Sequence, residues 1–193
     1  MLWLASGVAV AEPGDAAEAR QPSSVIPFVR NHPCHTRYRQ LAFSPPLKGT
    51  SHGDEGFPWR AMYGYCVAGG ERWLLHQDWV VSYHDAEPQG DNPGGDGVSA
   101  GTDISIQWPW FQEAAVSPYL ELGGGVQYAF GTPLPAHGSR FNFPSNSGAG
   151  LLISHGPGSA FNVALRYLHI SNGGLVSDNA GYDAFHLVIG VRW

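Results

Sequence analysis

The alternation in the final stretch of the chain, YDAFHLVIGVRW, constrains the fold more than any other feature of the sequence. Successive side chains of a β-strand point to opposite faces. One face of this stretch would be wholly apolar, with Phe185, Leu187, Ile189, Val191 and Trp193. The other face would be small, polar or cationic, with Ala184, His186, Val188, Gly190 and Arg192. This pattern, with an aromatic residue at its end, is typical of an outer-membrane β-barrel strand. In a soluble β-sandwich the apolar face would be core, so the stretch alone leaves both folds open.

Comparable aromatic-rich or alternating runs, separated by turn residues, occupy most of the chain. We predict strands over residues 57–69, 71–85, 102–110, 117–130, 149–155, 160–171 and 182–193, and a further one over 39–44. The glycine run inside 117–130 is expected to mark a bend or bulge. Residues 86–102, AEPQGDNPGGDGVSAGT, are rich in Gly, Asp and Pro and are predicted to be a loop. About seven or eight short strands fit a sandwich or a barrel.

The composition excludes several other classes. Aromatic residues make up 12% of the chain and charged residues only 13%, which argues against intrinsic disorder. The 26 glycines and 15 prolines argue against a helical bundle. A net charge of −6 without clustered cations argues against a nucleic-acid partner.

The N-terminal part carries a targeting pattern. Residues 1–11, MLWLASGVAVA, end in an A-x-A motif and are expected to be the remainder of an export signal peptide that begins further upstream. The alternative is an ordinary flexible N-terminus. Residues 12–56 are expected to be an extension that includes a first strand, and residues 57–193 the barrel domain. Cys34 and Cys66 would be able to form one disulfide in an oxidising compartment, but two cysteines alone make no zinc site.

The stretch ALRYLHISNGGLVSDNAGYD, residues 164–183, carries the chemistry. His169 and Ser171 share one strand face, and a loop over 172–181 would join this strand to the last one. If Asp183 lies opposite His169 in that hairpin, their Cβ atoms are ~5 Å apart. A hydroxyl, an imidazole and a carboxylate would then converge, as nucleophilic acyl transfer requires. The cluster lies on the face assigned to lipid, which suits a lipid substrate. The alternative is a set of hydrated polar residues at the headgroup level.

The string RYLHISNGGL, followed by NAG, resembles the signature of the outer-membrane lipid A 3-O-deacylase family. The segments LELGGGVQYAF and FNFPSNSGAGLLI also resemble middle strands of that family, so the resemblance covers about residues 98–193. It implies an all-β fold, namely an eight-stranded antiparallel transmembrane β-barrel of the bacterial outer membrane. It also implies hydrolysis of the ester-linked 3-hydroxyacyl chain at the 3-position of lipid A, with no metal and no other cofactor.

The resemblance also assigns roles to individual residues. Ser171 would be the nucleophile, His169 the general base, and Asp183 the acid that orients the histidine, where the family usually has Glu. Loop positions that the family associates with the oxyanion or its support are matched by Asn172, Gly174 and Asn179.

Three positions depart from the family pattern. Gly173 replaces the common Ala and Asp178 replaces a Pro, which should alter only loop stiffness. Asp183 is one methylene shorter than Glu, which would either weaken the orientation of His169 or require a closer register.

The implied partners are lipid A or lipopolysaccharide and outer-membrane lipid, and a homodimer is left open. Two other function classes stay open at this point. One is a non-catalytic outer-membrane barrel with a structural or adhesive role. The other is a soluble exported β-sandwich that binds carbohydrate through its 7 Trp and 8 Tyr residues.

Overall fold

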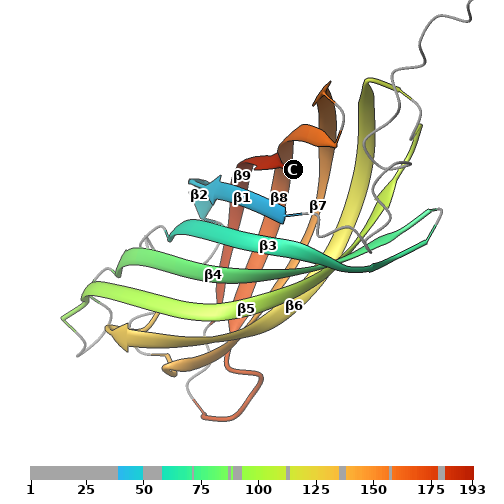
Figure 1. Ribbon diagram of the computed structural model, residues 1–193. Coiled ribbons are helices and arrows are strands. Elements are labelled where there is room, and N and C mark those ends of the chain that lie inside the picture. The colour runs from blue at the N-terminus through green and yellow to red at the C-terminus, as the bar shows by residue number, and fades with distance from the viewer. Residues whose placement is uncertain are drawn as a thin grey trace, which may run out of the picture.

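The protein is a single antiparallel sheet that closes into a barrel (Figure 1). The computed structural model describes residues 39–49, 58–70, 72–86, 88, 93–111, 114–134, 138–156, 158–177 and 181–193. Its strands are β1 (Arg39–Ser44), β2 (Pro46–Gly49), β3 (Trp59–Gly69), β4 (Leu74–Ala86), β5 (Gly95–Pro109), β6 (Val116–Gly131), β7 (Phe141–Gly156), β8 (Ser159–Ser171) and β9 (Tyr182–Arg192). The chain therefore has the predicted all-β fold.

Closure depends on the two short N-terminal strands. Each strand from β3 to β8 pairs with the next strand along the chain. The short strand β1 pairs with both β3 and β9, and β2 also pairs with β9. Since β1 and β2 follow each other along β9, they act as one interrupted strand, and the barrel has eight strand positions. The break is at Pro45, which lies outside both strands. The first strand is found where residues 39–44 predicted it, and it belongs to the barrel.

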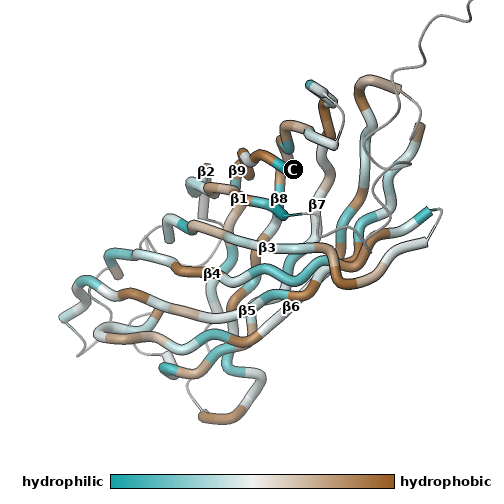
Figure 2. The backbone as a smooth tube through the Cα atoms, viewed as in Figure 1, coloured by the Kyte–Doolittle hydropathy of each residue, from teal (hydrophilic) through white to brown (hydrophobic). Residues whose placement is uncertain are grey.

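The two faces of the sheet follow the predicted alternation. On β9 the side chains of Phe185, Ile189 and Val191 are exposed on the exterior, and Leu187 is half-buried there. The intervening residues from Ala184 to Arg192 are buried inside the barrel. Figure 2 shows the corresponding alternation of hydrophobic and hydrophilic segments along the strands. The exterior is therefore the apolar, lipid-facing side of a membrane barrel. Among the described residues, no helix is long and apolar enough to cross a bilayer.

The interior is filled by buried polar side chains. Arg166 on β8 donates from Nε and Nη2 to the two carboxylate oxygens of Glu121 on β6, at 2.7 and 3.1 Å. Gln107 on β5 donates to Glu121 at 3.1 Å and accepts from Arg192 on β9 at 2.8 Å. Arg192 also donates to Gln40 on β1 at 2.7 Å. This lumen network links five strands across the barrel.

Two strands begin well before their predicted starts. β5 begins at Gly95, so the loop prediction is wrong for residues 95–102, and β7 begins at Phe141 rather than at residue 149. The added residues of β5 show no alternation of apolar and polar residue types in the sequence, but they pair continuously with β4, and from Gly97 onward also with β6. Pairing with neighbouring strands thus outweighs weak local propensity. In β7 the added residues include Pro144, and the β6–β7 ladder is interrupted there.

The strand β6 bends along its length (Figure 1), and its glycine run lies in the interior of the strand. A Cβ atom at Gly123 would lie 2.6 Å from the carbonyl oxygen of Ile104 on β5. The two backbones approach too closely there for a side chain, which explains the run and agrees with the predicted bend.

The two ends of the barrel differ in their connections. Arg39 and Trp193 exchange backbone hydrogen bonds at one end, where residues 70–73, 110–115 and 157–158 connect strands. The connections at the other end are longer and comprise residues 50–58, 87–94, 132–140 and 172–181. The β8–β9 loop extends from this second end, at the bottom of Figure 1. The export-signal prediction and the Cys34–Cys66 pairing involve residues outside the described ranges.

Candidate active site

The hairpin of β8 and β9 brings His169 and Asp183 together. The two residues are direct cross-strand partners, as predicted. His169 Nδ1 lies 2.7 Å from Asp183 Oδ1. A carboxylate accepts hydrogen bonds, so this contact places the proton of the neutral imidazole on Nδ1. It leaves the lone pair of Nε2 available to accept a proton, which is the arrangement that a general base requires.

A third side chain, Tyr167, joins this pair. Its hydroxyl donates to Asp183 Oδ1 at 2.5 Å, so the same oxygen accepts from both Tyr167 and His169. Sequence reasoning did not assign Tyr167 to the site. The two-residue period placed it on the face of His169, but strand periodicity does not show which hydroxyl reaches which carboxylate.

The cluster opens to the exterior of the barrel. The side chains of His169 and Asp183 are 39% and 28% exposed, respectively. Tyr167 and Ser171 lie half-buried on the same face of β8 as His169, whereas Leu168 and Ile170 point inward and are buried. The site is therefore accessible from the lipid-facing side, close to the end of the barrel with the longer loops.

Two serine hydroxyls flank the imidazole. Ser171 ends β8 two residues after His169 on the same face, as predicted, and pairs with Phe143 of β7. Ser145 of β7 is exposed and lies directly opposite His169, and sequence reasoning missed it. In the described part of the chain, neither serine has a hydrogen bond to His169. Such contacts are often long without substrate, so both serines are candidates for the nucleophile on this geometry.

The loop after Ser171 is held by Asn172. This residue is buried, and its Oδ1 accepts from the backbone N–H of Gly174 at 2.8 Å. The backbone carbonyl of Asn172 accepts from Leu175 N–H at 3.2 Å. Asn172 and Gly174 therefore stabilise the turn together. Asn179, the other predicted loop residue, lies outside the described ranges.

Glycines shape the loop at both of its ends. Gly173 has φ 63°, which glycine adopts far more readily than alanine, so its presence instead of the family's Ala relieves the backbone here. Gly181, with φ 69°, begins the return to β9. A Cβ atom at Gly181 would lie 3.2 Å from His169 Cε1. The absence of a side chain there lets the loop pass beside the imidazole.

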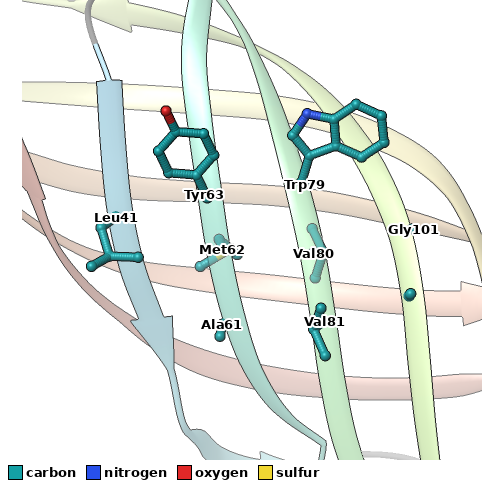
Figure 3. Close-up of a pocket in the computed structure, with 9 residues that line it drawn as sticks. Leu41, Ala61, Met62, Tyr63, Trp79, Val80, Val81 and Gly101 are labelled. Atoms are coloured by element: carbon teal, nitrogen blue, oxygen red, sulfur yellow. The ribbon is translucent and has the colours of Figure 1, made fainter.

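A separate apolar groove of about 510 Å³ lies on the exterior, over β1, β3, β4 and β5. Figure 3 shows Tyr63 and Trp79 projecting beside Ala61 and Gly101, which leave the hollow. Its lining contains no carboxylate, imidazole or aliphatic hydroxyl group, so we assign no catalytic role to it. Within the described ranges, no group of three or more His, Cys, Asp or Glu residues is arranged to hold a metal ion.

Comparison with known proteins points to one family. The family model for lipid A 3-O-deacylase (PagL) matches residues 55–192. Lipid A deacylase PagL of Pseudomonas aeruginosa is 34% identical over 79 residues, which cover 40% of this chain and 43% of that protein. The aligned region therefore spans less than half of that relative.

Two solved structures share the fold. A crystal structure of the outer membrane enzyme PagL superposes with a TM-score of 0.60 and 23% identity, over 78% of this chain and 97% of the other. Neisserial surface protein A gives a TM-score of 0.50 and 17% identity, over 81% of this chain and 94% of the other. At these identities the likeness concerns the fold, and together with the closed sheet it rules out the β-sandwich.

Proposed function

Because the chain belongs to the lipid A 3-O-deacylase (PagL) family, we propose that it is a hydrolase of the bacterial outer membrane. Its reaction would remove the ester-linked 3-hydroxyacyl chain from the 3-position of lipid A. The observation that carries this proposal is the His169–Asp183 pair, which lies beside Ser171 on the lipid-facing side of the barrel. A base and a hydroxyl on that face suit a substrate whose acyl chains lie in the bilayer.

The first half of the reaction forms an acyl-enzyme. Ser171 Oγ attacks the ester carbonyl carbon of lipid A while His169 Nε2 takes the hydroxyl proton. Asp183, which accepts from Nδ1 at 2.7 Å, stabilises the resulting imidazolium. The tetrahedral intermediate collapses when the bond to the 3-oxygen of lipid A breaks. That oxygen leaves with the proton from His169, and the acyl group remains on Ser171.

The second half releases the fatty acid. A water molecule gives a proton to His169 Nε2 and attacks the acyl-serine carbonyl carbon. Cleavage of the serine ester then releases the 3-hydroxy acid, and the proton returns to Ser171 Oγ. The oxyanion of each tetrahedral intermediate needs N–H donors near the serine. We assign Asn172 and Gly174 to shaping that loop, because a hydrogen bond joins them. We assign Asn179 to donating a hydrogen bond to the oxyanion or to supporting the group that does.

The proposal is tested by mass spectrometry of lipid A from cells with and without the protein. The parental chain should remove one 3-hydroxyacyl unit, and Ser171→Ala should leave lipid A unchanged. Ser145→Ala is the matched control, because it removes a hydroxyl from the same face beside His169, and it should behave like the parent. An unchanged lipid A spectrum with a folded parental barrel in the outer membrane would instead indicate a non-catalytic barrel.

A further inference from the structure

One oxygen of Asp183 accepts two hydrogen bonds on the barrel exterior. Tyr167 Oη donates to Oδ1 at 2.5 Å, and His169 Nδ1 lies 2.7 Å from the same atom. All three residues come from the hairpin of β8 and β9, and Tyr167 and His169 are alternate residues of one strand. The tyrosine thus lies on the side of the carboxylate nearer the middle of the strand, and the histidine on the side nearer the loop.

The Asp183 carboxylate lies beside an apolar ring, and this makes the hydrogen bond from Tyr167 important. The side chain next to Asp183 on the exterior face of β9 is Phe185, and its ring packs against that of Tyr167 with centroids 5.5 Å apart. A carboxylate beside apolar groups is costly unless hydrogen-bond donors surround it. A hydroxyl donor to a charged oxygen gives a short and strong hydrogen bond. The phenol can therefore stabilise the ionised carboxylate at the edge of an apolar surface.

The Tyr167 hydroxyl also restricts the rotation of the short Asp183 side chain. A carboxylate held only by the imidazole could rotate about its χ angles and lose the contact. With two donors on one oxygen, rotation away from His169 also breaks the bond to Tyr167. The aspartate is then held in the rotamer that reaches Nδ1.

We propose that Tyr167 is a positioning residue that acts through Asp183 to hold His169 in its reactive orientation. This inference rests on the proposed function for its effect on rate, but its effect on the His169–Asp183 contact does not depend on the substrate. The competing interpretation is that Tyr167 is a rim aromatic residue that contributes only packing through its ring. Tyr167→Phe separates the two, because it keeps the ring beside Phe185 and removes only the hydroxyl.

The kinetic test is a double-mutant cycle with lipid A as substrate. Tyr167→Phe should lower kcat about tenfold, as loss of a hydrogen bond to a charged group predicts, with KM nearly unchanged. In the Asp183→Asn background the same change should have no further effect, because there is no ionised carboxylate to position. An equal loss in both backgrounds, or parental activity of Tyr167→Phe, would overturn the proposal.

A measurement without substrate keeps the inference separate from the proposed function. The proton on His169 Nδ1 is followed by NMR in a barrel labelled with ¹⁵N-histidine, and its resonance is assigned by its loss in His169→Gln. In Tyr167→Phe this resonance should shift and exchange faster with water. Tyr83→Phe is the matched control. The Tyr83 hydroxyl on β4 donates to the Asp96 carboxylate on β5 at 2.6 Å in an exposed position, so this substitution should leave the His169 signal unchanged.

The outcomes of the two tests can be told apart. If the parental protein does not cleave lipid A but the His169 resonance responds only to Tyr167→Phe, the proposed function fails and the positioning of the imidazole stands. If Tyr167→Phe leaves the resonance unchanged, Tyr167 does not position the imidazole, whatever the enzyme acts on.

Discussion

Strand β8 carries a polar cluster on each of its faces, and the two clusters hold their charges in different ways. On the inner face, the Arg166 guanidinium is buried and bonded to both oxygens of Glu121, which also accepts from Gln107. On the outer face, His169 is partly exposed and bonded through one nitrogen to Asp183. The lumen network uses the charged groups to join strands, whereas the outer cluster leaves Nε2 and a nearby hydroxyl available.

This difference shows that polarity alone does not identify the reactive site of a barrel. An arginine stays protonated and cannot serve as a base, and a fully bonded buried pair has no group left for a substrate. A histidine with one nitrogen fixed has a second nitrogen that can exchange a proton. We therefore expect substitutions on the two faces of β8 to separate catalysis from barrel stability.

The largest effect should come from the outer cluster. His169→Ala and Ser171→Ala should each lower the deacylation rate by ~10³-fold or more, because they remove the proposed base or the proposed nucleophile. Both side chains point outward near the end of β8, so the folded barrel should persist. The rates are compared by mass spectrometry of lipid A, and folding by heat-modifiable migration in gels. If Ser145→Ala abolished activity and Ser171→Ala did not, the nucleophile would be Ser145.

The next effect concerns the carboxylate. Asp183→Asn should lower activity by at least ~10²-fold, because its amide can donate to Nδ1 and so favour the wrong imidazole tautomer. Asp183→Glu keeps the charge and should lose much less, although the aspartate already reaches His169 at 2.7 Å. Turnover at equal barrel yield measures the difference. Equal rates for Asp183→Asn and the parent would leave a Ser–His dyad.

On the inner face, the expected loss is in stability. Arg166→Met leaves the Glu121 carboxylate buried without its cation, which typically costs about 3–5 kcal/mol of unfolding free energy. Arg166→Met combined with Glu121→Gln should be less harmful, because the unpaired charge is removed as well. Denaturant unfolding of the purified barrels measures both variants. Activity per folded molecule should remain near the parental value, and a catalytic loss as large as that of His169→Ala would contradict the separation of the two faces.

The smallest expected effect concerns the glycine beside the imidazole. Gly181→Ala introduces about 1–2 kcal/mol of backbone strain at positive φ and places a Cβ near His169. Activity should fall a few-fold. Gly158→Ala is the control, because it has a comparable φ of 75° in a turn at the opposite barrel end. Equal activity losses in the two variants would mean that the contact with His169 is irrelevant.

Much of this division could be predicted from the two-residue period. It assigned the faces of β9 correctly, because alternation is a geometric consequence of an extended strand. The pairing of Asp183 with His169 was a condition of the predicted site, and the register of the hairpin meets it. The family string supplied the candidate role of Asn172, and it agreed with the role of Ser171 that the shared strand face had already suggested. The resemblance also implied the eight-position barrel, which the structure and the comparisons confirm.

The remaining features depend on contacts that a pattern does not encode. The hydrogen bond from Tyr167 to Asp183 requires particular side-chain rotamers. The hydrogen bond that Asn172 accepts from Gly174 depends on the positive φ angles of the two glycines that follow Asn172. The start of β5 at Gly95 is fixed by its neighbouring strands rather than by its own residues. Ser145 comes next to His169 only through the pairing of β7 with β8. The strand predicted from alternation to start at residue 149 did not include Ser145, and the family-like segment that does include it gave no pairing register.

The central claim is that the outer cluster of β8 and β9 contains an activated serine, and covalent labelling tests it most directly. The folded barrel is treated with a fluorophosphonate, which bonds to serine hydroxyls activated by a base. The modified peptide is then mapped by mass spectrometry. We predict a single adduct on Ser171 that is absent from His169→Ala, with Ser145 unmodified. An adduct on Ser145, or equal labelling of Ser171 in the parent and in His169→Ala, would contradict this account.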